Sequence, residues 1–458
     1  MRADLSVALL AILVLGSGCR KEPEPWDAAT EQPWMSGGAQ TVFDQGAGAF
    51  GHMFPHISAD KAAVHGIGDS QFGATFVSAP APLNPGLGPV FNSVSCTNCH
   101  ISDGRGKPPS GNEQLVSMLF RLSMDGVDAH GGPMPVPGFG GQLQQRSIFG
   151  VVPEANVAIS WTETPMTLGE GSTVLLRRPS FTITDAYTPM PAGVRMSARV
   201  APPVFGLGLI EAIAESDIRA HADPSDADGD GISGRPNVVW DVPRQRMALG
   251  RFGWKAEQPS LLQQTASAYV EDMGITNPLF PEESCTGQPQ YGTPNTGIEL
   301  SDSILHAVAF YVRSLAVPAR RAVQDPNVVR GGQLFTQAGC DRCHTPMQRT
   351  AVDVSFPEVS NQVIFPYTDL LLHDMGPDLA DDRPIFVADG REWRTPPLWG
   401  IGLTQVVNGH QNFLHDGRAR SVLEAVLWHG GEAERSRNAV RDMTASERQA
   451  LLAFLNSL

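Results

Sequence analysis

Apolar side chains recur at helical spacing in a segment that begins near residue 302. They are Ile304, Leu305, Val308, Val312 and Leu315. This spacing turns one stripe of a helix toward a core. Asp302 suits the start of the predicted helix and Arg313 its end, because the helix dipole favours an acid at the N-terminus and a base at the C-terminus. Val317-Pro318 stops the helix, and the segment that follows, up to Pro326, is typical of an interdomain linker.

Two more helices are predicted near the C-terminus, each begun by a capping box. Thr444 and Glu447 begin the last helix, whose apolar face is Leu451, Leu452, Phe454, Leu455 and Leu458. Ser421 and Glu424 begin the other, in which Val422, Ala425, Val426 and His429 share one face. His429 is therefore expected on the buried side of an amphipathic helix.

The N-terminus carries a short apolar run that is typical of an export signal. Arg2 precedes the run Leu5–Leu15, which at about 11 residues is too short to span a bilayer. Small residues then lead to Cys19, as at a bacterial lipoprotein cleavage site. We expect residues 1–19 to be a lipoprotein-type signal peptide and residues 20–35 a flexible tether, with an ordinary cleaved signal as the alternative. The protein is then expected in the periplasm, held at the outer membrane only through a lipid anchor.

Composition narrows the class of the exported part. Charged residues make up 18% of the 458 residues and hydrophobic residues 41%, as in a globular protein, while 47 Gly and 37 Pro predict long loops. The 33 Lys and Arg against 48 Asp and Glu give a net charge of −15. This charge excludes a nucleic-acid binder, because no basic surface neutralises phosphates, and it suits a cationic protein partner.

Two pentapeptides carry the most specific chemistry. Cys96-Thr97-Asn98-Cys99-His100 and Cys340-Asp341-Arg342-Cys343-His344 both have the form Cys-X-X-Cys-His. In this motif two thiols attach a haem covalently and the adjacent His binds the iron. We therefore predict two covalent haem c groups, held by Cys96, Cys99 and His100 and by Cys340, Cys343 and His344. Cys285 is left over and is expected to be a buried or tolerated thiol.

The surroundings of the two motifs form an internal repeat. A Gly and a Phe precede each motif at equal spacing, Gly88 and Phe91 before the first and Gly332 and Phe335 before the second. We expect a short helix before each attachment site. The repeat divides the chain into an N-terminal cytochrome c-like domain at 36–320, loop-rich with a few short strands such as Val174–Leu176, and a C-terminal one at 327–458, closed by the terminal helix.

The sixth iron ligand decides between electron transfer and catalysis. For the second haem His429 is the leading candidate, with Met375 and His410 behind it. For the first haem the available side chains have no decisive context: His52, His56, His65, Met118, Met124, His130 and Met134. A vacant or weakly held position is therefore permitted at the first haem.

Longer motifs connect the chain to a family. With the two haem motifs, the runs Phe413–Arg418 and Ser421–His429 resemble the bacterial diheme cytochrome c peroxidases and the methylamine dehydrogenase maturation enzyme. The motifs Arg199–Glu211, Gly231–Asn237, Gly250–Lys255 and Glu392–Gly400 resemble more closely the family called di-haem oxidoreductase, putative peroxidase. The resemblance implies a mainly α fold of two cytochrome c domains, with a catalytic N-terminal haem and an electron-relay C-terminal haem.

The same resemblance suggests further site residues. Trp254 lies near the position where the peroxidases place an aromatic ring between the haems, and Gln264 with Glu271 or Asp272 resembles the segment that supplies a distal Gln and an acid. Cleaving a peroxide requires a group that moves a proton between its two oxygens, which a carboxylate can do. A core Trp and a surface charge are the simpler alternatives. The peroxidases carry Met, and the maturation enzyme Tyr, at the position of His429.

An acidic run resembles the start of a calcium loop. Asp226, Asp228 and Asp230 alternate and are followed by Gly231, as in an EF-hand, but the twelfth position is Asn237 and not Glu. A structural Ca²⁺ site is predicted there, with a solvated acidic turn as the alternative.

These inferences lead to an exported diheme oxidoreductase of the peroxidase type. We expect hydrogen peroxide to be reduced at the first haem, with electrons from a small cytochrome c, a cupredoxin or a protein substrate arriving through the second. The alternative is a non-catalytic diheme electron-transfer protein, linked to iron handling at the envelope. A permanent sixth ligand at the first haem favours the alternative.

Overall fold

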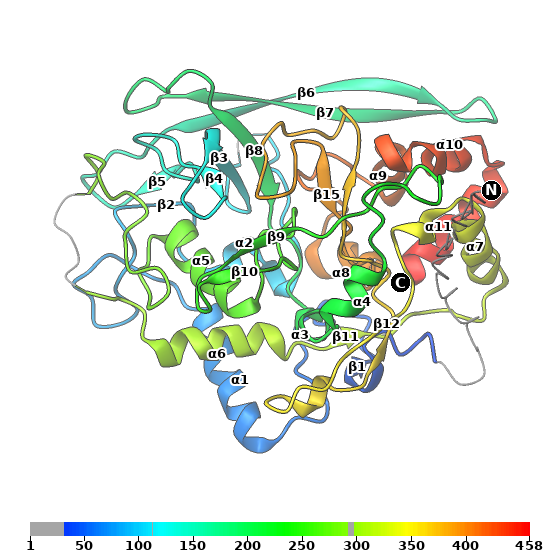
Figure 1. Ribbon diagram of the computed structural model, residues 1–458, viewed down its shortest axis with the longest axis horizontal. Coiled ribbons are helices and arrows are strands. Elements are labelled where there is room, and N and C mark those ends of the chain that lie inside the picture. The colour runs from blue at the N-terminus through cyan, green and yellow to red at the C-terminus, as the bar shows by residue number, and fades with distance from the viewer. Residues whose placement is uncertain (1–31, 112, 292–296) are drawn as a thin grey trace, which may run out of the picture. The chain divides into compact units, whose positions relative to one another are not determined.

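The computed structural model of the protein describes residues 32–111, 113–291 and 297–458. The predicted signal peptide and most of the predicted tether lie outside the described residues. Residues Pro33–Leu458 form one compact unit, with 28% helix and 20% strand in the chain (Figure 1). The expected helices are present, but a mainly α fold understates the strands. The predicted division between residues 320 and 327 stays a prediction.

The helices are short and are distributed along the whole described chain. The α-helices are α1 (Ala59–Phe72), α2 (Cys96–Cys99), α3 (Leu207–Glu211), α4 (Glu215–Ala220), α5 (Leu261–Met273), α6 (Asp302–Arg313), α7 (Pro326–Gln337), α8 (Thr404–Asn408), α9 (Val422–Leu427), α10 (Glu434–Asp442) and α11 (Ala445–Ser457). The 3-10 turns are η1 (Gly38–Gln40), η2 (Ile101–Asp103), η3 (Cys340–Arg342), η4 (Pro357–Val359), η5 (Ile401–Leu403) and η6 (Gly431–Ala433).

Most strands pair in two-stranded sheets. The strands are β1 (Thr41–Val42), β2 (Val90–Phe91), β3 (Met118–Val127), β4 (Pro133–Met134), β5 (Arg146–Ser147), β6 (Asn156–Thr167), β7 (Thr173–Thr184), β8 (Arg195–Val200), β9 (Val238–Asp241), β10 (Arg246–Leu249), β11 (Val317–Pro318), β12 (Gln348–Arg349), β13 (Val363–Ile364), β14 (Leu372–Asp374) and β15 (Glu392–Arg394). One sheet has three strands, in the order β4-β3-β8, and the parallel pair β1-β11 joins an early segment to the end of α6.

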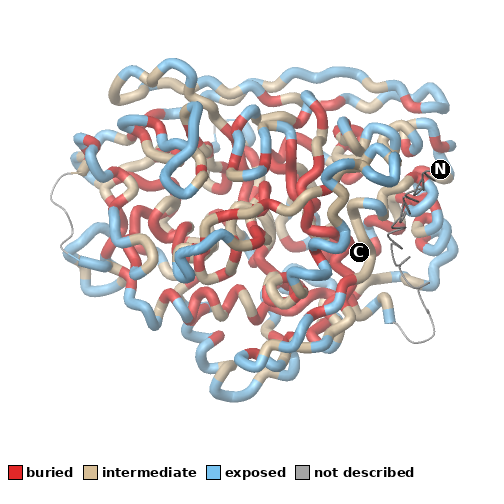
Figure 2. Tube along the Cα trace, viewed as in Figure 1, coloured by how far each residue is buried: buried red, intermediate tan, exposed pale blue. Residues whose placement is uncertain are grey.

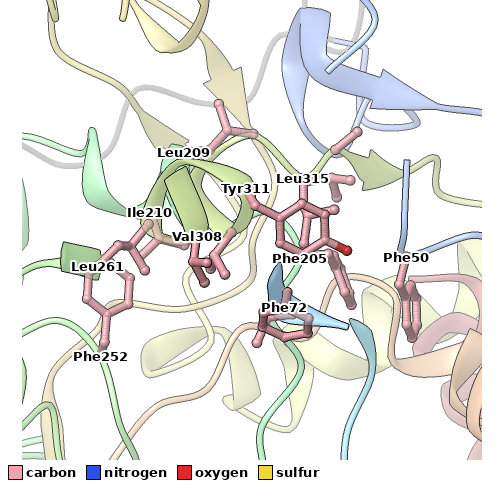
Figure 3. Packing of buried hydrophobic residues seen from close by; sticks show 14 of the residues in the cluster. Phe50, Phe72, Phe205, Leu209, Ile210, Phe252, Leu261, Val308, Tyr311 and Leu315 are labelled. Atoms are coloured by element: carbon pink, nitrogen blue, oxygen red, sulfur yellow. The ribbon is translucent and has the colours of Figure 1, made fainter. Parts of the chain in front are cut away.

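Helices α1 and α6 pack against each other beneath the first haem motif. The predicted helix from 302 is confirmed as α6, although its N-cap is Ser301 and not Asp302. The contact is close because Gly68 of α1 faces the backbone of α6, where a Cβ would lie 2.1 Å from the carbonyl oxygen of Ala307. Around α6 lies the largest apolar cluster, in which Phe50 and Phe205 stack with ring centroids 4.2 Å apart (Figure 3).

Helices α7 and α11 form the matching crossing before the second motif. The predicted capping box of Thr444 and Glu447 is confirmed at the start of α11. Gly331 of α7 allows the crossing, since a Cβ there would lie 2.0 Å from the carbonyl oxygen of Ala450. The ring of Phe335 lies 5.2 Å from that of Phe454. This region therefore has the pre-haem and terminal helices that the sequence predicts.

Three local predictions fail. The segment before the first haem motif is the strand β2, so the expected helix precedes only the second motif. Ser421 caps α9 by accepting from the amide of Glu424, but the Glu424 carboxylate binds the amide of Arg420 and not that of Ser421. Helix α9 ends at Leu427, so His429 follows the helix instead of lying within it.

The hairpin β6-β7 is the main element that the sequence analysis missed. Its two strands pair over twelve residues each, from Asn156 with Thr184 to Thr167 with Thr173, and it extends along one side of the molecule (Figure 1). Its outer face is exposed, while its inner residues are more buried (Figure 2). Ile159 and Phe181 pack on the cluster around β3, and Leu168 and Leu176 on the cluster around α11. The hairpin thus packs on two separate apolar clusters, one around β3 and one around α11.

None of the described helices is both long enough and apolar enough to cross a membrane.

Candidate functional site

One large cavity connects the two Cys-X-X-Cys-His motifs. Its volume is about 390 Å³, and its lining includes Cys96, Cys99 and His100 of the first motif and Cys340, Cys343 and His344 of the second. These cysteines form no disulfide with one another or with Cys285. The cavity draws on segments from the N-terminal, middle and C-terminal parts of the chain, so tertiary packing builds it.

The second motif places its histidine close to His429 in the lining of the cavity. Helix α7 leads into η3, which carries Cys340, and His344 follows. Its Nδ1 donates to the carbonyl oxygen of Tyr367 at 3.0 Å, and Nδ1 of His429 donates to that of Ala425 at 2.8 Å. Burial first, and then the charge of His429, lowers the pKa of His344 to about 4. Both rings line the cavity as neutral imidazoles, and the Nδ1 bonds reserve Nε2 of each for a metal.

The first motif is built in the same way on its proximal side. Helix α2 is a single turn that carries Cys96 and Cys99, and Nδ1 of His100 donates to the carbonyl oxygen of Pro202 at 2.8 Å. Burial lowers the pKa of His100 to about 4, so its Nε2 is available as a ligand at neutral pH. The ring of Phe72 at the end of α1 lies 6.1 Å from that of His100. The α1–α6 crossing therefore supports this histidine.

The side chains proposed as a second ligand of the first haem all lie elsewhere. They are His52, His56, His65, Met118, Met124, His130 and Met134, and none of them lines the large cavity. His65 bonds Ser314 Oγ through Nδ1 at 2.8 Å, and His130 stacks on Trp240 with ring centroids 4.1 Å apart. Of the two alternatives at the second haem, Met375 lines the cavity, and His410 lies outside it with Nε2 near the carbonyl oxygen of Arg105.

The polar lining of the cavity suits two haem groups. A haem carries two propionates, and the cavity is lined by Arg105, Arg121, Arg199, Arg251, Arg394 and Arg437. Nε of Arg105 and Nη1 of Arg199 are buried without a hydrogen-bond partner. Arg105 also donates through Nη2 to the carbonyl oxygen of Leu414, and Arg199 pairs with Asp381, so one nitrogen of each guanidinium is left for a propionate oxygen to satisfy. The unpaired thiols, the three oriented imidazoles and these guanidinium groups together fit covalently attached haem.

Of the two acids predicted for the first haem, Asp272 lines the large cavity. It lies near the end of α5, and its Oδ1 accepts from Nε2 of Gln142 at 2.9 Å. Burial raises its pKa, although Arg121 and Gln142 act in the opposite direction. Its charge in turn raises the pKa of Cys96 and Cys99, which places it close to both attachment thiols. Asp272 can therefore hold a proton beside the first motif.

Glu271 is directed to a different part of the molecule. It forms an ion pair with Arg121 and lines a separate, smaller cavity. Gln264, the predicted distal amide, lines the large cavity with Asp272. Helix α5 separates the two adjacent carboxylates because successive residues on a helix point in different directions.

Trp254 also lines the large cavity. Its Nε1 donates to the carbonyl oxygen of Val200 at 2.8 Å, and its own carbonyl oxygen accepts from the amide of Arg394 at 2.9 Å. The guanidinium of Arg105 lies 5.7 Å from the centre of its ring. The indole is therefore held in the wall of the cavity that both haem motifs line.

A second tryptophan was not singled out from the sequence. Trp393 of β15 stacks on His415 with ring centroids 3.7 Å apart, and both line the cavity. Nζ of Lys255 lies 4.6 Å from the centre of the Trp393 ring and 2.7 Å from Oδ1 of Asp381. Lys255, His415 and Trp393 belong to the motifs Gly250–Lys255, Phe413–Arg418 and Glu392–Gly400, so the motifs contained the signal, but the contacts of these residues with one another and with Asp381 required the fold.

The acidic loop is compact but incomplete as a calcium site. One carboxylate oxygen from each of Asp226, Asp228 and Asp230 lies within 4.8 Å of the others. Oδ2 of Asp230 is 3.0 Å from Nη1 of Arg342, in the second haem motif. Asn237, at the twelfth position, turns away from the loop, and its Nδ2 donates to the carbonyl oxygen of Lys255 at 2.7 Å.

Comparisons with known proteins place the chain in context. The family model described as "Di-haem oxidoreductase, putative peroxidase" matches residues 31–458. None of the curated proteins compared with the chain matches it. A solved structure of Kuenenia stuttgartiensis hydrazine synthase, pressurised with 20 bar xenon, is similar at 19% identity over 38% of this chain and 66% of that chain, with a TM-score of 0.22. The chain thus spans slightly less than two thirds of that relative, and a likeness at this TM-score carries no argument.

Proposed function

The chain belongs to the di-haem oxidoreductase, putative peroxidase family, and on that premise we propose that it reduces hydrogen peroxide beside its first haem motif with electrons that enter through the second. One observation carries the proposal: Asp272, a carboxyl whose pKa burial raises, lines the cavity beside Cys96 and Cys99, where none of the seven candidate second ligands lies. An accessible coordination position with a proton-holding group beside it is the arrangement that peroxide cleavage needs.

Each proposed residue has a distinct task. Cys96 and Cys99 hold one haem and Cys340 and Cys343 the other, with the neighbouring histidines as iron ligands and His429 as second ligand at the C-terminal site. When bound, the haems supply the redox chemistry and the iron that binds peroxide. A pair of histidines gives a lower reduction potential than His with Met, so His429 makes the second site a stronger electron donor.

Asp272 moves the proton. Reduction of one peroxide consumes two electrons and two protons and gives two water molecules. We propose that Oδ2 of Asp272 accepts the proton from the peroxide oxygen that binds and returns it to the oxygen that leaves, while Gln142 fixes Oδ1. Gln264 orients the peroxide from the same cavity wall. General acid–base catalysis of this kind contributes roughly 10²–10⁴-fold to a rate.

Trp254 is the proposed contact for electrons between the two haem sites. Its ring is held by the bond from Nε1 to Val200 and by the main-chain bond to Arg394. The Trp393 ring has the cations of Lys255 and Arg199 within 4.6 and 4.8 Å, and such cations oppose removal of an electron. Trp254, with one guanidinium at 5.7 Å, is the easier of the two to oxidise.

Partners and location follow from the sequence and stay predictions. The electron donor is proposed to be a small, cationic cytochrome c or cupredoxin or a protein substrate, because the chain carries a net charge of −15. The lipid anchor at Cys19, the periplasmic location and Ca²⁺ binding by Asp226, Asp228 and Asp230 belong to the same proposal.

The test compares Asp272→Asn with the wild-type holoprotein. EPR and optical spectra before and after stoichiometric peroxide report whether the first haem reacts, and steady-state reduction of peroxide reports turnover. We expect a high-spin first haem in the resting protein, and a loss of roughly 10²-fold or more in peroxide turnover in Asp272→Asn. Asp125→Asn is the matched control, because Asp125 is an exposed carboxylate that pairs with Arg195 on the surface. Two low-spin haems that ignore peroxide would leave the electron-transfer alternative.

A further inference from the structure

A second cavity lies on the other side of the side chain that binds Asp272. Its volume is about 260 Å³, and its lining includes Gly141, Gln142, Gln144, Glu271, Glu282 and Ser284. Glu282 is exposed, so the cavity reaches the surface there. Gln142 is only 3% exposed, and it separates this smaller cavity from Asp272 in the wall of the large one.

The amide nitrogen of Gln142 is hydrogen-bonded, but its amide oxygen has no partner. Its Nε2 donates to Oδ1 of Asp272 and to the carbonyl oxygen of Glu271, both at 2.9 Å. Its Oε1 is buried without a hydrogen-bond partner, as is Oγ of Ser284. Buried polar atoms in folded proteins are almost always bonded to protein or to water. The cavity lining is mixed, with Val270, Leu279, Phe280 and Pro281 beside the polar residues, and a cavity of this size accommodates water molecules that satisfy both buried atoms.

Behind this cavity lies a carboxyl that holds a proton at neutral pH. Glu154 is 1% exposed, and its Oε2 accepts from the amide of Gln144 at 2.7 Å. Burial raises its pKa to about 8, although the bonds from Gln144 and Gln288 favour the charged form. The other titratable groups that interact with it are Tyr187 and Cys285, whose pKa values it raises. The smaller cavity therefore adjoins a buried carboxyl group that is protonated at neutral pH.

We infer that the smaller cavity is the entry through which water and protons reach Asp272, and that Gln142 is the positioning residue between the cavity and the acid. The inference rests on the proposed role of Asp272. The two protons consumed per peroxide come from solvent by this route, and the two electrons come from the donor already proposed. Asp272 lines the large cavity and its hydrogen-bond partner Gln142 lines the smaller one, so the smaller cavity offers a route to the acid from the side away from the first haem motif.

Gly141 offers a way to close the cavity without touching Asp272. A Cβ on Gly141 meets no atom within 4 Å, and its backbone angle suits any residue. Its carbonyl oxygen accepts from the amide of Leu122 at 2.8 Å, a bond that a new side chain leaves in place. Since Gly141 lines the smaller cavity, Gly141→Leu is the variant chosen to occupy it. Gly66→Leu is the matched control, because a Cβ on Gly66 in α1 also meets no atom within 4 Å and Gly66 lines neither cavity.

The measurement is exchange of the Asp272 carboxyl proton for deuterium. Infrared spectra of the holoprotein are recorded after rapid transfer into D₂O at a pH where Asp272 is protonated, and its band is assigned by its loss in Asp272→Asn. We expect exchange in Gly141→Leu to be slower by roughly tenfold or more, because a local opening must then precede it. Exchange as fast as in wild type and Gly66→Leu would overturn the inference, as would the absence of an Asp272 band at every pH.

Two further variants keep the test decisive. If Gly141→Leu does not fold, Ser284→Leu fills the cavity from another wall and carries the same expectation. Gln142→Leu removes the bond that favours the charged carboxylate, so we expect the pKa of Asp272, followed by the same band, to rise. An unchanged pKa would remove Gln142 as a positioning residue. These results do not depend on peroxide turnover. If exchange is slowed in Gly141→Leu while Asp272→Asn keeps full peroxide turnover, the entry route stands and the proposed function is rejected.

Discussion

The close crossing of α1 and α6 predicts that the same substitution has opposite effects on the free energy of unfolding at two glycines of one helix. Gly66 and Gly68 both lie within α1, two residues apart, and both are replaced by alanine. At Gly68 the new Cβ would lie 2.1 Å from the carbonyl oxygen of Ala307 and 2.7 Å from Cβ of Tyr311, whereas ordinary contact begins at 3.4 Å. At Gly66 it would meet nothing within 4 Å.

The magnitudes follow from two effects. Alanine is more favourable than glycine in a helix interior by about 1 kcal/mol, and this gain is the same at both positions. At Gly68 the helices must move apart by about 1 Å, and overpacking of a core costs about 1–3 kcal/mol. Gly66→Ala is therefore expected to raise the free energy of unfolding by up to about 1 kcal/mol. The free energy of unfolding of Gly68→Ala is expected to be about 1–3 kcal/mol lower than that of Gly66→Ala, because both variants have the same gain in helix propensity and only the overpacking differs.

The crossing also positions the first haem site. Tyr311 of α6 donates to Oδ1 of Asp103 at 2.7 Å, and its ring lies 5.1 Å from Phe72, the neighbour of His100. Moving α6 should therefore disturb the optical spectrum of the first haem in Gly68→Ala and leave it unchanged in Gly66→Ala. Calorimetric unfolding of both holoproteins, with the visible spectrum as a second probe, is the assay. Equal or greater stability in Gly68→Ala than in Gly66→Ala would refute the packing argument.

Three other predictions concern the ligand, the relay and acid stability. His429→Met should raise the reduction potential of the second haem, since His/Met ligation favours the reduced iron more than His/His; spectroelectrochemistry checks it, and an unchanged potential excludes His429 as ligand. Trp254→Phe should slow electron transfer between the haems more than Trp393→Phe does, as measured by flash photolysis, and the reverse order would move the relay to Trp393. The third prediction concerns Asp353. Burial acts to raise its pKa, but hydrogen bonds from Ser355 and from the amide of Phe356, together with the charge of Arg313, lower the pKa to about 2. Since the lowered value favours the folded state above the ordinary 3.8, this stability is lost as the pH falls from about 4 toward 2; Asp353→Asn should flatten the loss in acid unfolding, and an unchanged slope would contradict it.

Much of the site could be predicted because its signals are local. The haem motifs are contiguous pentapeptides, and the start of α11 is given by Thr444 and Glu447, three residues apart. His429 was predicted from spacing to lie on a buried face, and it does line the cavity together with His344, although the helix ends two residues before it. The hairpin β6-β7 also had a partial signal in the sequence, because Val157, Ile159 and Trp161 alternate with small or polar residues, but only Val174–Leu176 was predicted as a strand.

The sequence by itself determined which residues can attach haem, which segments form the helices before and after the second motif, and which few side chains can serve as acid or ligand. Only the tertiary structure showed that Asp272 lines the large cavity and Glu271 the smaller one, because this depends on which side of α5 faces each cavity. It also brought Gln142 to Asp272 across 130 residues of chain. The physical reason is that caps, helical stripes and attachment motifs act within a few residues. The surroundings of a buried carboxyl depend instead on segments that only the folded core brings together.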